Sequence, residues 1–188
     1  MKRWICFFAL FIVVMVVCFV GYVYMNRAPF LATALSNALE TTVKVKSLDF
    51  SKQGLQIRNL TIMNPPGCDI KNAFSVDKIN VKMDWWEVIK GVSGISKNKI
   101  IIDQIKIEKP DMTVELFNAT GSDSNWSRIL AKLSSDAQKK KAEAAPSSER
   151  HFAIRKLVLT EVKFQLKHHS LAQLNVKPIV VDKLEIRD

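Results

Sequence analysis

The segment Leu55–Ile62 reads LQIRNLTI and contains the pattern from which the fold can be predicted. An apolar residue, any residue and a second apolar residue are followed by two polar residues, after which the apolar triplet returns. The same frame occurs in five further segments: Val43–Phe50, Phe74–Val81, Ile100–Ile107, Phe152–Leu159 and Ile179–Ile186. Because chance would give roughly two such frames in a chain this apolar, the frame indicates a weak internal repeat.

Each triplet of the frame alternates apolar and other residues, which is typical of a β-strand with one apolar face. The two triplets have opposite parity, so a straight strand would direct them to opposite faces. A bulge or a corner at the polar pair would return both to one face. The polar pairs are Arg58-Asn59, Asp77-Lys78, Asp103-Gln104, Arg155-Lys156 and Asp182-Lys183. Repeated bends predict a mainly β fold with short helices, in which a curved, largely antiparallel sheet forms a groove. Ordinary strands with edge bulges in a sandwich are the alternative.

An apolar segment without a charged residue runs from Trp4 to Tyr24. As an α-helix it would cover roughly 32 Å, enough for a hydrocarbon core of about 30 Å. A cleaved signal peptide is the alternative, but its apolar region is normally shorter and ends in small residues, whereas this one ends in bulky ones. Since Lys2 and Arg3 precede the segment, the N-terminus is expected to stay in the cytoplasm and the body to be exported.

The rest of the chain divides by composition. Apolar residues at helical spacing from Phe30 to Leu39 predict an amphipathic helix directly after the anchor. Two more short helices are expected, one capped by Asp84 and one beginning near Ser124. The second carries four apolar residues on one face: Trp126, Ile129, Leu130 and Leu133. Residues 136–150 are rich in Ser, Ala and Lys, which predicts a polar linker. The expected organisation is a transmembrane anchor at residues 1–27, a β-domain at 28–135, the linker at 136–150, and further strands of the same sheet at 151–188.

Charge and motifs favour a membrane partner over an active site. The formal net charge is +10, and a basic body can meet nucleic acid or anionic lipid. The anchor places the body beside lipid, so no nucleic-acid partner is expected. The sequence contains no G-x-S-x-G, no H-E-x-x-H and no phosphate-binding glycine loop. The three histidines lack ligand spacing, and Cys68 is the single cysteine outside the apolar segment. We therefore expect no catalytic residue, no metal and no cofactor.

The first two-thirds of the chain resembles the AsmA-like family. Members open with a transmembrane helix, an amphipathic helix and a strand pair that ends in an N-P-P-G-like turn. The matching positions here are Gly54, Ile57, Asn59, Leu60, Ile62, Asn64, Pro65, Pro66 and Gly67. The resemblance continues through Trp86–Gly91, Ile100–Pro110 and Asn125-Trp126, and it covers most of residues 1–135.

This resemblance implies a single-pass protein of the bacterial inner membrane, with its body in the periplasm and a β-groove related to bridge-like lipid transfer proteins. Its function would be non-enzymatic lipid handling or outer-membrane biogenesis, with anionic lipids or phospholipids as partners. The residues expected to face lipid are Leu55, Ile57, Leu60, Ile62, Phe74, Val76, Ile79, Val81, Ile102 and Ile107.

Two observations keep other functions open. About ten strands at roughly 4.8 Å each give a sheet near 50 Å across, which is short for spanning an envelope, so an envelope partner or self-association would be needed. The alternative function is a membrane-tethered binding or assembly domain whose β-core is filled by its own side chains. An envelope hydrolase would need a nucleophile–base pair that the sequence does not show.

Overall fold

The computed structural model describes residues 21–22, 24–93, 99–118, 120–131, 151–168 and 177–187. Most of the predicted anchor at Trp4–Tyr24 and the whole predicted linker at 136–150 lie outside these residues. Within them, no helix has the length and apolar character needed to cross a membrane.

The described chain is mainly β with short helices, as the sequence predicts. Its helices are α2 (Arg27–Leu39) and α3 (Trp85–Val92), and residues 125–131 are also helical. The strands are β1 (Val43–Ser51), β2 (Gly54–Met63), β3 (Asn72–Lys82), β4 (Lys99–Ile102), β5 (Gln104–Glu108), β6 (Asp111–Leu116), β7 (His151–Ile154), β8 (Lys156–His168) and β9 (Ile179–Arg187).

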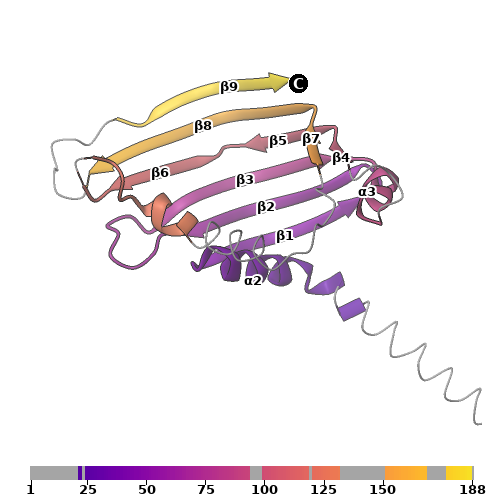
Figure 1. Ribbon diagram of the computed structural model, residues 1–188, viewed down its shortest axis with the longest axis horizontal. Coiled ribbons are helices and arrows are strands. Elements are labelled where there is room, and N and C mark those ends of the chain that lie inside the picture. Colours follow the sequence, from indigo (N-terminus) through magenta and orange to yellow (C-terminus); the bar gives the residue numbers. More distant parts are fainter. Residues whose placement is uncertain are drawn as a thin grey trace, which may run out of the picture.

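Seven of these strands form one curved sheet (Figure 1). β1, β2 and β3 are antiparallel neighbours. β5 and β6 lie end to end along the far side of β3 and are both antiparallel to it. β8 runs parallel to β5 and β6, and β9 is antiparallel to β8. The sheet is therefore mixed, and the expectation of a largely antiparallel sheet did not foresee the parallel pairing of β8.

A single row of residues bends the sheet along its whole width. The strand registers place Lys46, Asn59, Asp77, Lys109, Glu161 and Asp182 side by side on successive strands. We call this row the crease. Asn59, Lys109 and Glu161 have positive φ angles of 49°, 54° and 54°, a conformation that L-residues rarely adopt. No residue is inserted at the crease, because the registers on its two sides are the same. The predicted corner is present there, whereas the predicted bulge is not.

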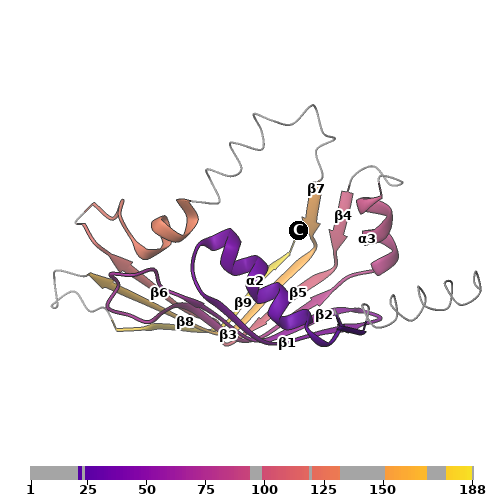
Figure 2. The same ribbon diagram turned by 90° about the horizontal axis from the view of Figure 1, so that it is seen from below.

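A second bend separates a small two-stranded sheet from the large one. β4 precedes β5 and β7 precedes β8, with only Asp103 and Arg155 between them, and β4 and β7 pair in parallel. The guanidinium of Arg155 lies 2.8 Å from the carboxylate of Asp103. Figure 2 shows β4 and β7 rising from one end of the sheet. The polar pairs that begin at Asp103 and Arg155 therefore mark this second bend and not the crease.

All described helices lie on one side of the sheet (Figure 2). α2 covers β1 and β2 on the inside of the curve, where Leu35 and Leu39 pack against the core. Arg27 ties the start of α2 to the edge of the sheet, since its Nε–H donates to the carbonyl of Leu48 and its Nη2 lies 2.6 Å from Asp49. Asp84 caps the N-terminus of α3, as predicted, and the Asp84 carboxylate accepts from the N–H of Trp86 at 2.8 Å. The outer side of the sheet has no described helix.

Candidate functional site

One face of the large sheet is apolar on both sides of the crease. Phe74 and Val76 precede the crease in β3 and Ile79 follows it, yet all three belong to one cluster of packed side chains. In β2, Ile57 precedes the crease and Leu60 follows it, with the same result. Residues that lie three positions apart on the two sides of the polar pair must therefore point to the same face, as the frame predicts. The apolar residues of both triplets therefore share one face, which we call the apolar face.

Helix α2 covers the apolar face over β1 and β2, and its apolar side chains reach the core that these strands share with β3. Val43, Leu60 and Val76 are 4%, 6% and 3% exposed and form the centre of the core. Leu35 and Leu39 of α2 pack against them from above. We call the concave apolar face of the sheet the trough, and this part of it is covered by the protein's own side chains.

The apolar face continues past α2 to the last strand. Cross-strand neighbours point to the same side of a sheet, and the registers link Ile79 to Ile107, Leu159 and Leu184 in turn. A second row on the other side of the crease joins Phe74 to Met112, Phe164 and Ile179. On β9 the apolar-face residues are 40–55% exposed: Ile179, Val181, Leu184 and Ile186. The face thus passes from a covered core to an open apolar surface.

Most of the residues expected to face lipid lie together, but largely beneath α2. Leu60 and Val76 are buried, and five others surround them half-buried: Ile57, Ile62, Phe74, Ile79 and Ile107. Leu55 and Val81 are half-buried cross-strand neighbours, two residues from Ile57 and Ile79 along β2 and β3. They border a hollow of about 340 Å³ whose other lining residues are mostly polar. Ile102 lies apart in β4, beyond the second bend.

The open surface on β8 and β9 was not among the residues selected from the sequence. Its members are Leu157, Leu159, Val162, Phe164, Ile179, Val181, Leu184 and Ile186. The sequence contains a pattern that could have identified this surface, because Leu157–Phe164 has the same apolar triplets around the polar pair Thr160-Glu161. That frame overlaps the frame Phe152–Leu159, which hides it when the segments are counted separately.

On the opposite face of the large sheet, most side chains are polar. Asp49, Gln56, Asn80 and Lys106 occupy one row across four strands. The Nε2 of Gln56 donates to Oδ1 of Asn80 at 2.6 Å. The sheet is therefore amphipathic, with mostly polar side chains on one face, where Val158 and Val180 are exceptions, and aliphatic side chains on the other.

A buried carboxylate holds one end of the trough in place. Glu115 and Asn125 are fully buried. The Glu115 carboxylate accepts from the backbone N–H groups of Asp69 and Ile70 at 3.0 and 3.4 Å, which fixes the loop between β2 and β3. Asn125 accepts from the N–H of Glu115 at 2.9 Å and donates to Oδ1 of Asn64 at 2.7 Å. These contacts give Glu115 a structural role.

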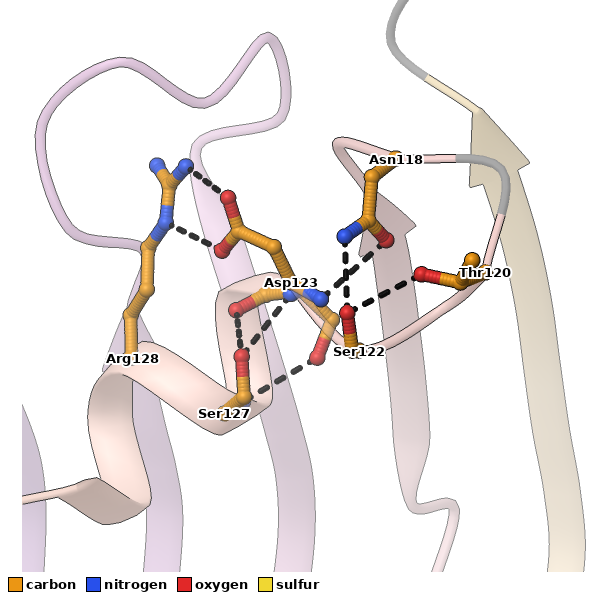
Figure 3. Close-up of polar contacts among 7 residues, drawn as sticks. Asn118, Thr120, Ser122, Asp123, Ser127 and Arg128 are labelled. Atoms are coloured by element: carbon orange, nitrogen blue, oxygen red, sulfur yellow. Dashed lines mark hydrogen bonds and ion pairs between the residues drawn. The ribbon is translucent and has the colours of Figure 1, made fainter.

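The helix at residues 125–131 is fixed beside this end by polar contacts. Arg128 binds Asp123 through two N–H groups, each 2.8 Å from a carboxylate oxygen, and Asn118 donates to Ser122 at 2.8 Å (Figure 3). Ile129 is 2% exposed and anchors the helix, whereas Leu130, which the sequence places on the inner face, is 44% exposed. Leu133, assigned to the same face, lies outside the described residues.

Charged groups form a cluster on the edge strand β9. Lys183, Lys156 and Arg187 all contact the carboxylate of Glu185, at distances of 3.0, 3.1 and 2.6 Å. Their hydrogen bonds stabilise the ionised form and lower the pKa of Glu185 from its ordinary 4.5 to about 2. Because Glu185 alternates with Leu184 and Ile186 along β9, this cluster of three cations and one carboxylate lies on the opposite, polar face of the edge strand.

The remaining reactive groups offer no assembled centre in the part of the chain that the structure describes. Within it, no three His, Cys, Asp or Glu side chains lie close enough together to hold a metal ion. Burial, joined by the negative charge of Glu115, raises the pKa of the Cys68 thiol, so this thiol stays protonated at neutral pH.

Comparisons of the sequence with protein-family models and with curated proteins found no match.

Proposed function

We propose that this protein is a non-enzymatic, membrane-anchored envelope protein that binds the acyl chains of phospholipid on its open apolar face. The observation that carries the proposal is the continuity of that face from the core beneath α2 to β9. Aliphatic side chains that are 40–55% exposed on one side of a curved sheet form a surface that acyl chains can cover. The basic net charge, +10, favours anionic headgroups at its border.

The proposed anchor and orientation rest on the N-terminal segment, and the inner membrane and periplasm are what the AsmA-like resemblance implies. The apolar segment at Trp4–Tyr24 would anchor the chain in the inner membrane, with the N-terminus in the cytoplasm and the sheet in the periplasm. The lipid-binding part of the trough would then begin where α2 stops covering it. A reporter that is active only after export, fused after Asp188, should be active. A shortened, soluble product would overturn the anchor.

A second candidate function is a tethered binding or assembly domain with a self-filled core. The observation that favours it is the burial of Leu60 and Val76 beneath α2. Val76→Asp cannot separate the two functions, because an unpaired charge at a buried position costs several kcal/mol and would unfold a domain of ordinary stability under either. The discriminating positions are those on β9.

Lipid extraction from two variants of β9 tests the proposal. Ile186 is 53% exposed on the apolar face and Val180 is 64% exposed between two apolar-face residues, so it points to the other side. Both Ile186→Asp and Val180→Asp should fold. Mass spectrometry of organic extracts should find phospholipid with the wild-type chain and with Val180→Asp, and much less with Ile186→Asp. Lipid absent from the wild type would favour the self-filled domain.

A further inference from the structure

Strand β9 ends the sheet without a neighbour on its outer side among the described residues. The opposite edge is partly covered, because Arg27 of α2 donates to the Leu48 carbonyl of β1. An open edge strand presents unpaired N–H and C=O groups that can pair with another chain. The apolar residues on β9 are 40–64% exposed: Ile179, Val180, Val181, Leu184 and Ile186.

The apolar-face residues and the central charges of β9 are complementary to themselves, whereas Val180 and Glu185 on the other face are not. If two copies of β9 run antiparallel with Asp182 opposite Lys183, then Ile179 stands opposite Ile186 and Val181 opposite Leu184. In a regular strand, residues an odd number of positions apart point to opposite faces. Each of these pairs would then bring together one side chain from each face of the sheet. The crease removes this conflict, since Val181 and Leu184 lie on the same face although they are three residues apart.

The row of charged residues along the crease ends at β9 without a cation. Asp77 lies 3.8 Å from Lys109, and the register places Glu161 next to Lys109 and Asp182 next to Glu161. The row therefore ends in two carboxylates on neighbouring strands, an arrangement that destabilises a strand pair. A lysine beyond Asp182 would restore the alternation of charge.

We propose that two copies of this chain join through β9 in this antiparallel register, with Asp182 of each copy opposite Lys183 of the other. A two-fold axis perpendicular to the sheet generates both ion pairs and both sets of apolar pairs. The two sheets become one, and the apolar face continues from one copy into the other, with the two creases offset by one residue. The trough then has twice its length, with an α2 helix at each end. Binding of lipid is not needed for this association.

Charge reversal tests the register with the full-length chain in mild detergent. The wild type should be a dimer by sedimentation velocity. Asp182→Lys places lysines opposite each other and Lys183→Asp places aspartates opposite each other, so each variant alone should dimerise about tenfold more weakly or worse. An equimolar mixture should recover dimerisation as a heterodimer, and so should the double variant Asp182→Lys/Lys183→Asp as a homodimer.

Lys71→Asp, an exposed loop position with the same change of charge, is the control and should remain a dimer. A monomeric wild type would overturn the proposal and leave the edge free for the strand of another protein. Reversal variants that dimerise like the wild type, or a mixture that stays monomeric while circular dichroism shows folded chains, would also overturn it.

Discussion

Lys109 and Glu161 stand opposite each other where β5 and β6 meet β8, and both have a φ of 54°. The N–H of Lys109 donates to the carbonyl of Thr160 at 2.9 Å, and the N–H of Lys163 donates to the carbonyl of Pro110 at 2.8 Å. The hydrogen-bond ladder therefore continues through the bend. Two neighbouring strands adopt the same rare conformation in the same row, which turns the apolar residues on both sides of it toward one face.

Glycine at the crease should be tolerated better than glycine in a regular part of β8. An L-residue in the left-handed region costs roughly 1–2 kcal/mol, and relief of that strain offsets the extra chain entropy of glycine, about 0.5–1 kcal/mol. In urea unfolding, Glu161→Gly should keep or slightly raise the free energy of unfolding. Lys163→Gly should lower it by about 0.5–1 kcal/mol.

Valine supplies the opposite test at the same position. Because a β-branched side chain tolerates positive φ poorly, Glu161→Val should lower the free energy of unfolding by about 1 kcal/mol or more. Equal stability of the valine and glycine variants would contradict the left-handed conformation at Glu161.

Glu115 should matter for folding and not for chemistry. Glu115→Ala removes the acceptor of the Asp69 and Ile70 N–H groups, and each lost hydrogen bond to a carboxylate costs about 1.5–3 kcal/mol. The midpoint of urea unfolding should fall accordingly. Asp103→Ala breaks an exposed ion pair with Arg155 and should change stability by less than about 1 kcal/mol. If Glu115→Ala were fully stable yet inactive, a catalytic role would have to be reconsidered.

The crease could be foreseen because its cause is local. Two apolar triplets of opposite parity in one strand cannot share a buried face without a bend, and the polar pairs Arg58-Asn59, Asp77-Lys78 and Asp182-Lys183 lie at the bend that the structure contains. The frame also occurs with Pro110 as its third apolar residue, in the segment Ile105–Met112, where it escapes a search limited to aliphatic and aromatic residues.

What the sequence could not provide is the order of strands and the part of the face that is covered. The return of β8 parallel to β5 and β6 depends on a connection between distant segments, and no local pattern encodes it. The burial of Leu60 and Val76 results from the docking of α2 by Leu35, Leu39 and Arg27. Selecting lipid-facing residues by their pattern alone therefore favoured the closed half of the trough.

The edge strand should respond to acid through Glu185. Its pKa is lowered from 4.5 to about 2 in the folded chain, so its ion pairs stabilise the fold above pH 4.5 and are lost as the pH falls toward 2. Hydrogen exchange of the amides in β9 should accelerate over this interval beyond the effect of pH on intrinsic exchange. In Glu185→Gln the additional acceleration should be smaller. If the exchange rates of the β9 amides did not change beyond the intrinsic effect of pH, the ion pairs of Glu185 would not stabilise this strand.

The most direct test of lipid binding is photo-crosslinking from two positions of one strand. A benzophenone amino acid in place of Leu184 would project from the apolar face, and the same group in place of Val180 would project from the other face. After irradiation of cells and purification, mass spectrometry should find phospholipid adducts with the probe at position 184 and only background with the probe at position 180. Equal labelling at both positions, or no lipid adduct at position 184 in a folded chain, would contradict the proposed function.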